Sequence, residues 1–202
     1  MERDRLEAFS DGVIAVAITL LALDLGVAAP GHGSLLSQLG DHWPSFVAYL
    51  ISFFTIGIIW VNHHDLFKNI AYVDRTLLFL NLVLLLFVVV IPFATSTMAK
   101  YLTSGNQDAH VAMAIYAIAF EGMALSFAAI FSWTLGEGRL LRPIPIEARG
   151  PAWIQFSIGG IVYVVAIAVA FISAPLALAI IGMVAVYYVF QRTPGPHPSQ
   201  NH

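Results

Sequence analysis

Residues 5–25, RLEAFSDGVIAVAITLLALDL, predict a membrane helix on which the rest of the fold depends. The stretch begins with charged residues, passes through Ser10 and Asp11, and then runs almost wholly apolar apart from one hydroxyl, Thr19. An acid and a guanidinium at the mouth of such a helix are costly, and they are usually retained for a pathway, a relay or a buried network. We therefore expect partners for these polar residues elsewhere in the chain.

The composition predicts an integral membrane protein. The 202 residues are 59% hydrophobic and only 10% charged, whereas soluble domains are about a quarter charged. The net charge of −3 and the lack of a basic run give no reason to expect a nucleic-acid partner. Cysteine is absent, which excludes disulfides, thiol catalysis and thiolate metal sites.

Six stretches approach the length of about 20 mostly apolar residues that a helix needs to cross a bilayer. They cover roughly residues 9–27, 45–63, 76–98, 111–135, 152–172 and the stretch from the turn at 173–175 to about 190. We expect an all-α membrane protein with one six-helix transmembrane domain over residues 1–192. Residues 193–202 are predicted to form a disordered polar tail.

The basic residues predict the orientation. With six spans, both termini lie on one side, and that side carries every lysine and arginine of the nine except Lys100. Because cytoplasmic loops carry the excess of positive charge, both termini are expected in the cytoplasm.

The first helix divides into two faces at about 100° per residue. Val16, Leu20 and Leu23 share one stripe, and Thr19 lies at its edge. If this stripe faces an axis, it can form a constriction that gates by dewetting. Periodicity alone favours ordinary helix or lipid contact for such a stripe.

Ser10 and Asp11 point away from that stripe, so Asp11 needs a partner inside the protein. The second span offers Trp60, His63 and His64, which share one face through their i, i+3 and i+4 spacing. The topology places them at the depth of Asp11. The predicted structural polar network comprises Arg5, Phe9, Ser10, Asp11, Trp60, Asn62, His63, His64 and Asn81.

These residues, taken together, resemble the signature of the transmembrane protein 175 family of potassium channels. The resemblance covers the first three spans in detail and the last three by topology. It rests on Arg5-x-x-x-Phe9-Ser10-Asp11 with the following Ile18-Thr19-Leu20-Leu21, on Trp60-x-x-His63-His64-x-x-Phe67, and on Asn81-Leu82 with Pro92-Phe93-x-Thr95.

The resemblance implies a potassium-permeable cation channel of weak to moderate selectivity, without a carbonyl-filter loop. In this family the first helix lines the pore, which assigns the constriction to Val16, Leu20 and Leu23. Thr19 matches a hydroxyl position linked to potassium preference, so permeant K⁺ is expected to bind transiently near it. A single motif in a six-span chain resembles the bacterial type, which implies a homotetramer in a bacterial inner membrane.

Two other function classes compete with a channel. A proton-coupled secondary transporter would use Asp11, His63 and the ionisable mid-span Glu121. A membrane enzyme with a histidine metal site would need several clustered histidine motifs, whereas the other histidines lie in loops and the tail. We therefore expect no enzyme, no resident metal and no cofactor, and we expect the lipid bilayer and monovalent cations as partners.

Overall fold

The computed structural model describes residues 2–26 and 34–190, so the predicted tail at residues 193–202 lies outside the described residues. For residues 146–149 and 151–157 it describes the helical backbone alone. The regular structure within these ranges is helical, in agreement with the predicted all-α class. The elements are α1 (Arg3–Leu21), the 3₁₀ helix η1 (Ala22–Asp24), α2 (Leu35–Asp41), α3 (Trp43–Lys68), α4 (Arg75–Tyr101), α5 (Gln107–Thr134), α6 (Ile146–Ala170) and α7 (Ala174–Phe190).

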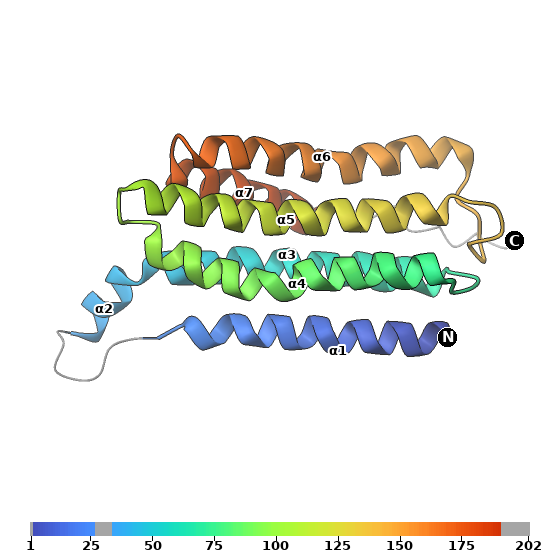
Figure 1. Ribbon diagram of the computed structural model, residues 1–202, viewed down its shortest axis with the longest axis horizontal. Helices are drawn as coiled ribbons and strands as arrows, with labels where there is room; N and C mark the ends of the chain where they lie inside the picture. Colours follow the sequence, from blue (N-terminus) through green and yellow to red (C-terminus); the bar gives the residue numbers. More distant parts are fainter. Residues whose placement is uncertain (1, 27–33, 191–202) are drawn as a thin grey trace, which may run out of the picture.

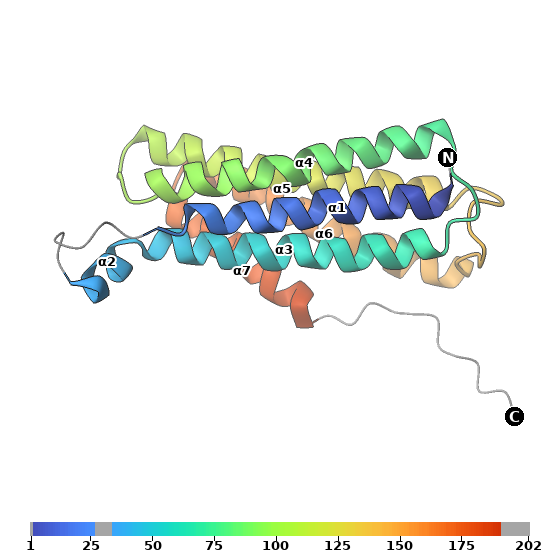
Figure 2. The same ribbon diagram turned by 90° about the horizontal axis from the view of Figure 1, so that it is seen from below.

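The long helices lie side by side along the longest axis of the molecule, and α2 projects at one end (Figures 1 and 2). Helix α1 lies on one side, α3 and α4 form the middle, and α5, α6 and α7 lie on the other side. The contact between α4 and α5 is the most extensive, followed by that between α5 and α6. Helix α1 packs mainly on α4 and α3, and the described residues leave much of its surface uncovered.

Among the residues whose side chains are described, four helices are long and apolar enough to cross a membrane: α1 continued by η1, α3, α4 and α5. The part of α6 whose side chains are described without a gap, Ile158–Ala170, is a shorter apolar helix, and so is α7. The long helices therefore match the predicted stretches, while the number of six spans stays a prediction.

Side-chain caps explain where two of the helices begin. The backbone N–H of Leu77 donates to Asp74 Oδ1 at 2.7 Å at the start of α4, and that of Asp108 donates to Asn106 Oδ1 at 3.0 Å at the start of α5. Each cap satisfies one of the N–H groups that the first helical turn leaves unpaired. Helix α1 begins at Arg3, earlier than the apolar pattern predicts, because its charged first turns are helix-forming residues.

The two ends of the bundle differ in charge. At one end the Arg3 guanidinium donates to the carbonyl of Lys68 at 3.0 Å, and the N–H of Ala71 donates to the carbonyl of Arg139 at 2.9 Å. At the other end Lys100 Nζ lies 3.6 Å from Asp24 Oδ1. The fold thus gathers the described basic loops at the end where α1 begins.

Candidate functional site

Helix α1 has one face buried in the bundle and one face that no described residue covers. The buried face consists of Leu6, Ser10, Ile14, Ala17 and Leu21. On the opposite face the exposed fractions are 51% for Phe9, 57% for Val16 and 38% for Leu20, and Leu23, in the η1 turn that continues α1, is 78% exposed. Small residues Gly12 and Ala15 and the hydroxyl of Thr19 are exposed on the same side. The stripe predicted from the sequence is thus an open apolar surface within a single chain.

The Thr19 hydroxyl is bonded within its own helix. Its Oγ1 donates to the carbonyl of Val16 at 2.8 Å. Such a bond satisfies the hydroxyl proton and leaves the oxygen lone pairs facing outward from the helix. Thr19 can therefore offer an oxygen ligand on the exposed face.

A hydrogen-bonded chain of three fully buried side chains joins α1 to α3 through α4. Asn81 Nδ2 donates to Ser10 Oγ at 2.9 Å, and Ser10 Oγ donates to the carbonyl of Leu6 at 2.9 Å. Asn81 Oδ1 lies 2.8 Å from His63 Nε2. Because the Asn81 amide nitrogen already donates to Ser10, its oxygen accepts, and His63 carries the proton on Nε2. His63 also stacks on Phe67 with ring centroids 3.8 Å apart.

Asp11 has its partner on α3, as the sequence predicts. The indole Nε1 of Trp60 donates to Asp11 Oδ1 at 2.9 Å. Trp60 also stacks on His64, with ring centroids 5.8 Å apart and planes inclined by 17°. One tryptophan therefore fixes the rotamer of the carboxylate and supports the neighbouring imidazole.

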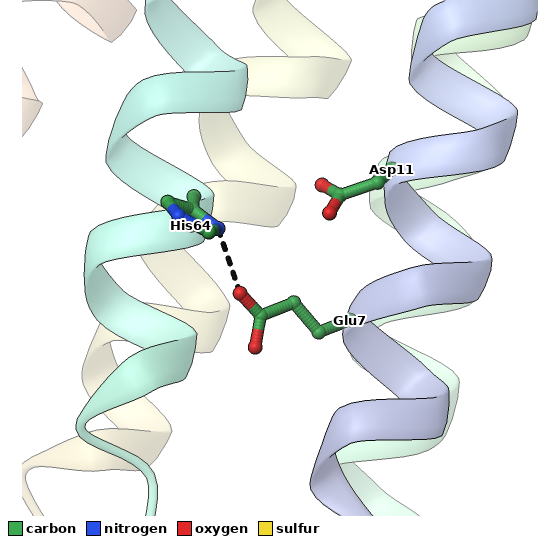
Figure 3. Close-up of side chains that lie close together, drawn as sticks. All are labelled: Glu7, Asp11 and His64. Atoms are coloured by element: carbon green, nitrogen blue, oxygen red, sulfur yellow. Dashed lines mark ion pairs between the residues drawn. The ribbon is translucent and has the colours of Figure 1, made fainter.

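Figure 3 shows an acid–base contact beside Asp11 that the sequence reasoning missed. His64 Nδ1 lies 2.7 Å from Glu7 Oε1, which makes an ion pair when the ring is protonated. Glu7 precedes Asp11 by four residues, so both carboxylates lie on the side of α1 that faces α3. This spacing is a signal in the sequence that would have found Glu7.

The structure does not bring Arg5 and Asn62 into the network, contrary to the prediction. Arg5 precedes Asp11 by six residues, which turns it about 120° away on the helix. Its side chain is exposed on the face of Phe9 and Val16, and no described residue forms a hydrogen bond or ion pair with it. Asn62 faces away from His64 and lines a cavity of about 540 Å³ together with residues of α7. Phe9 lies on the open face and not within the network.

Among the described residues, Glu7, Asp11 and His64 form a group whose ligand atoms all lie within 4.8 Å of one another. Carboxylate oxygen and imidazole nitrogen are ligands that divalent metals accept. Trp60 and the Glu7–His64 contact already supply partners for these groups, so the arrangement is complete as a structural clamp between α1 and α3.

The sequence and fold both match known proteins. The family model described as Endosomal/lysosomal potassium channel TMEM175 matches residues 5–92. A potassium channel of Streptomyces collinus is 45% identical over 197 residues, which cover 96% of this chain and 95% of that protein. The endosomal/lysosomal proton channel TMEM175 of Gallus gallus is 32% identical over 152 residues, which cover 71% of this chain and 30% of that protein.

A solved structure has the same fold over nearly the whole chain. It is the crystal structure of a lysosomal potassium-selective channel TMEM175 homolog from Chamaesiphon minutus, with a TM-score of 0.82 and 35% sequence identity. The match covers 93% of this chain and 96% of that one. The relatives are named channels, which are not enzymes, and they agree with the expectation of a multi-pass membrane protein. The chain belongs to the TMEM175 family.

Proposed function

We propose that this protein is a potassium-permeable cation channel whose pathway is lined by the exposed face of α1. The observation that carries the proposal is the open apolar stripe of Val16, Leu20 and Leu23 on a helix whose opposite face is anchored by buried polar contacts. A helix fixed in this way presents the same face in every copy. The potassium and proton channel names of the relatives support ion conduction.

Four copies of the chain would place four α1 helices around one axis. Stacked rings of Val16, Leu20 and Leu23 then form a hydrophobic constriction that gates by dewetting. Thr19 lies beside these rings, and its oxygen tunes selectivity by replacing part of the hydration shell of K⁺. Selectivity is weak to moderate because an apolar ring offers few oxygens.

We place the channel in a bacterial inner membrane as one six-helix domain over residues 1–192, with both termini in the cytoplasm. The charge distribution supports this orientation, because Arg3, Lys68 and Arg139 lie at one end of the bundle and Lys100 at the other. The clamp between α1 and α3 then lies toward the cytoplasmic end of the pathway.

The competing function is a proton-coupled transporter that uses Asp11, His63 and Glu121. Asp11 contacts Trp60 of α3 and His63 contacts Asn81 of α4, whereas Glu121 lines a separate cavity formed by α5 and α6. The three groups therefore do not form one cluster among the described residues, so the structure offers no direct proton relay that joins them.

Potassium flux in reconstituted liposomes distinguishes the two functions. Vesicles that contain the protein and are loaded with K⁺ and the permeant anion thiocyanate, which leaves with the cation and balances its charge, should release K⁺ down its gradient at a rate that does not change when a protonophore collapses the proton gradient. Valinomycin gives the full-release reference, and protein-free vesicles give the leak. Release that requires a proton gradient would contradict the channel proposal and favour the transporter.

A further inference from the structure

Glu121 is an ionisable residue in the middle of α5 that the proposed ion pathway does not use. Its Oε2 is inaccessible to solvent, and no described residue forms a hydrogen bond with it. An unpaired carboxylate within hydrocarbon costs several kcal/mol. Because no described residue neutralises this carboxylate, the group carries a proton or takes up a cation.

A cavity of about 580 Å³ lies beside this carboxyl group, between α5 and α6. Small residues, Ala124, Ala128 and Gly160, line it together with larger apolar side chains. Both carboxyl oxygens of Glu121 lie 3.8 Å from the position that a Cβ on Gly160 would occupy. The missing side chain at residue 160 thus leaves room directly beside the carboxyl group.

The cavity opens on the outer surface of the bundle. Its rim residues are exposed, with exposed fractions of 58% for Leu125 and 64% for Ile161. Helix α6 lies on the side of the molecule opposite α1 (Figure 1). If α1 faces the pore, this cavity faces the acyl chains of the bilayer.

We propose that this cavity binds a lipophilic monoamine that enters from the bilayer. The ammonium group would pair with the Glu121 carboxylate, and the hydrocarbon part would pack on the alanines and branched residues. The volume falls within the range of about 300–1,000 Å³ of small-molecule sites, and the lining matches their pattern of apolar walls with one placed polar group. Glu121 carries the one carboxyl group among the described lining residues, which matches a ligand with a single positive charge.

Binding of 1-adamantylamine to the full chain in lipid nanodiscs tests the charge pairing. The neutral isostere 1-adamantanol serves as the ligand control. Glu121→Gln keeps the shape of the side chain and should weaken amine binding by at least about tenfold, which is what one charge-assisted hydrogen bond contributes. Ser126→Ala is the matched variant, because Ser126 lies on the same helix outside the lining of the cavity and its hydroxyl donates to the carbonyl of Gly122 at 2.6 Å. It should bind the amine like the parent.

Labelling with dicyclohexylcarbodiimide provides a second readout by mass spectrometry. The protonated carboxyl group adds across one C=N bond of the reagent: the carboxyl oxygen bonds to the central carbon, and the proton goes to a nitrogen. The adduct rearranges to an N-acylurea, so the peptide gains the whole mass of the reagent and nothing leaves. Glu121 should be modified, bound amine should protect it, and Gly160→Leu should block both labelling and amine binding.

Equal amine affinity of the parent and Glu121→Gln would overturn the proposal, as would equal affinity for the amine and the alcohol. Absence of both labelling and binding would also overturn it, because another copy or a lipid would then cover the cavity. None of these outcomes depends on potassium flux, since the residues belong to α5 and α6 and not to α1.

Discussion

At the scale of single residues, Asn81 holds together the three helices around the proposed pathway. Its side chain contacts Ser10 on α1 and His63 on α3, and all three residues are fully buried. We expect Asn81→Leu to lower the free energy of unfolding by about 1–3 kcal/mol, because the buried polar groups that it serves lose their partners. Thermal unfolding of the purified protein in detergent measures the change.

Asn62 provides the matched control for this substitution. It lies on α3 and lines a cavity, and no described residue forms a hydrogen bond with its side chain. Asn62→Leu should therefore change the free energy of unfolding by no more than about 0.5 kcal/mol. If the two variants were destabilised equally, the buried chain through Asn81 would not be what anchors α1.

The sequence predicted part of this network for a clear physical reason. Helical spacing places Ser10 and Asp11 opposite the Val16 stripe, and the structure agrees. The same helical spacing places Arg5 about 120° away from Asp11, outside the network. Asn62 adjoins His63 in the sequence, but a rotation of about 200° on the helix separates it from His64. Which neighbouring helix each face meets is a tertiary property that a single helix does not encode.

At the scale of elements, α1 is anchored on one face and open on the other. We expect Leu20→Ala or Leu23→Ala to raise potassium flux or to weaken selectivity, because a smaller side chain widens an apolar ring and makes it easier to wet. Flux from K⁺- and Na⁺-loaded liposomes measures both effects. Leu176→Ala on α7, whose leucine is 52% exposed, is the matched control and should leave flux unchanged. If Leu20→Ala and Leu23→Ala both conduct like the parent, the constriction does not lie on this helix.

The contact between α4 and α5 depends on one glycine. A Cβ added to Gly122 would overlap the ring of Phe87, whereas one added to Gly57 meets no atom within 4 Å. Gly122→Ala should therefore lower the free energy of unfolding by about 1–3 kcal/mol through overpacking. Gly57→Ala should not destabilise the protein, because alanine favours the helix.

A double-mutant cycle with Phe87→Leu checks the cause of that effect. The smaller side chain at residue 87 makes room for the new methyl group, so Gly122→Ala should cost less in this background. An unchanged cost, measured by the same unfolding experiment, would mean that Phe87 is not the neighbour that limits residue 122.

The helices themselves were well predicted from the sequence, but their ends were not. Apolar stretches locate α3, α4 and α5 because membrane-length runs leave few other interpretations. Polar end turns, such as the charged residues that begin α1 at Arg3, are invisible to hydropathy. Caps such as Asp74 and Asn106 determine these boundaries. In the sequence, such a cap can be recognised only from a capping residue type next to the apolar stretch.

At the scale of the whole molecule, the two ends of the bundle carry different charges. Asp24 follows the last residue of the apolar stripe and lies 3.6 Å from Lys100. In a tetramer the four Asp24 carboxylates would attract cations to this mouth, and Lys100 would offset part of their charge. Lys100→Gln should raise potassium flux at low ionic strength roughly twofold, within the range of an exposed ion pair.

This effect should vanish in high salt, because exposed charges are then screened. Asp24→Asn should act in the opposite direction and lower the flux under the same conditions. If Lys100→Gln left the flux unchanged at low salt, the Asp24 end would not be a mouth of the pathway.

The central claim is that K⁺ passes along the exposed face of α1. The chain contains no cysteine, so a single introduced thiol is the only target for a thiol reagent. Val16→Cys, Leu20→Cys and Leu23→Cys can be tested beside Leu176→Cys, with potassium flux measured before and after a cationic methanethiosulfonate reagent. The account predicts that flux is blocked in variants of the α1 stripe and unchanged in the α7 variant. Full labelling of the three α1 cysteines without loss of flux would contradict it.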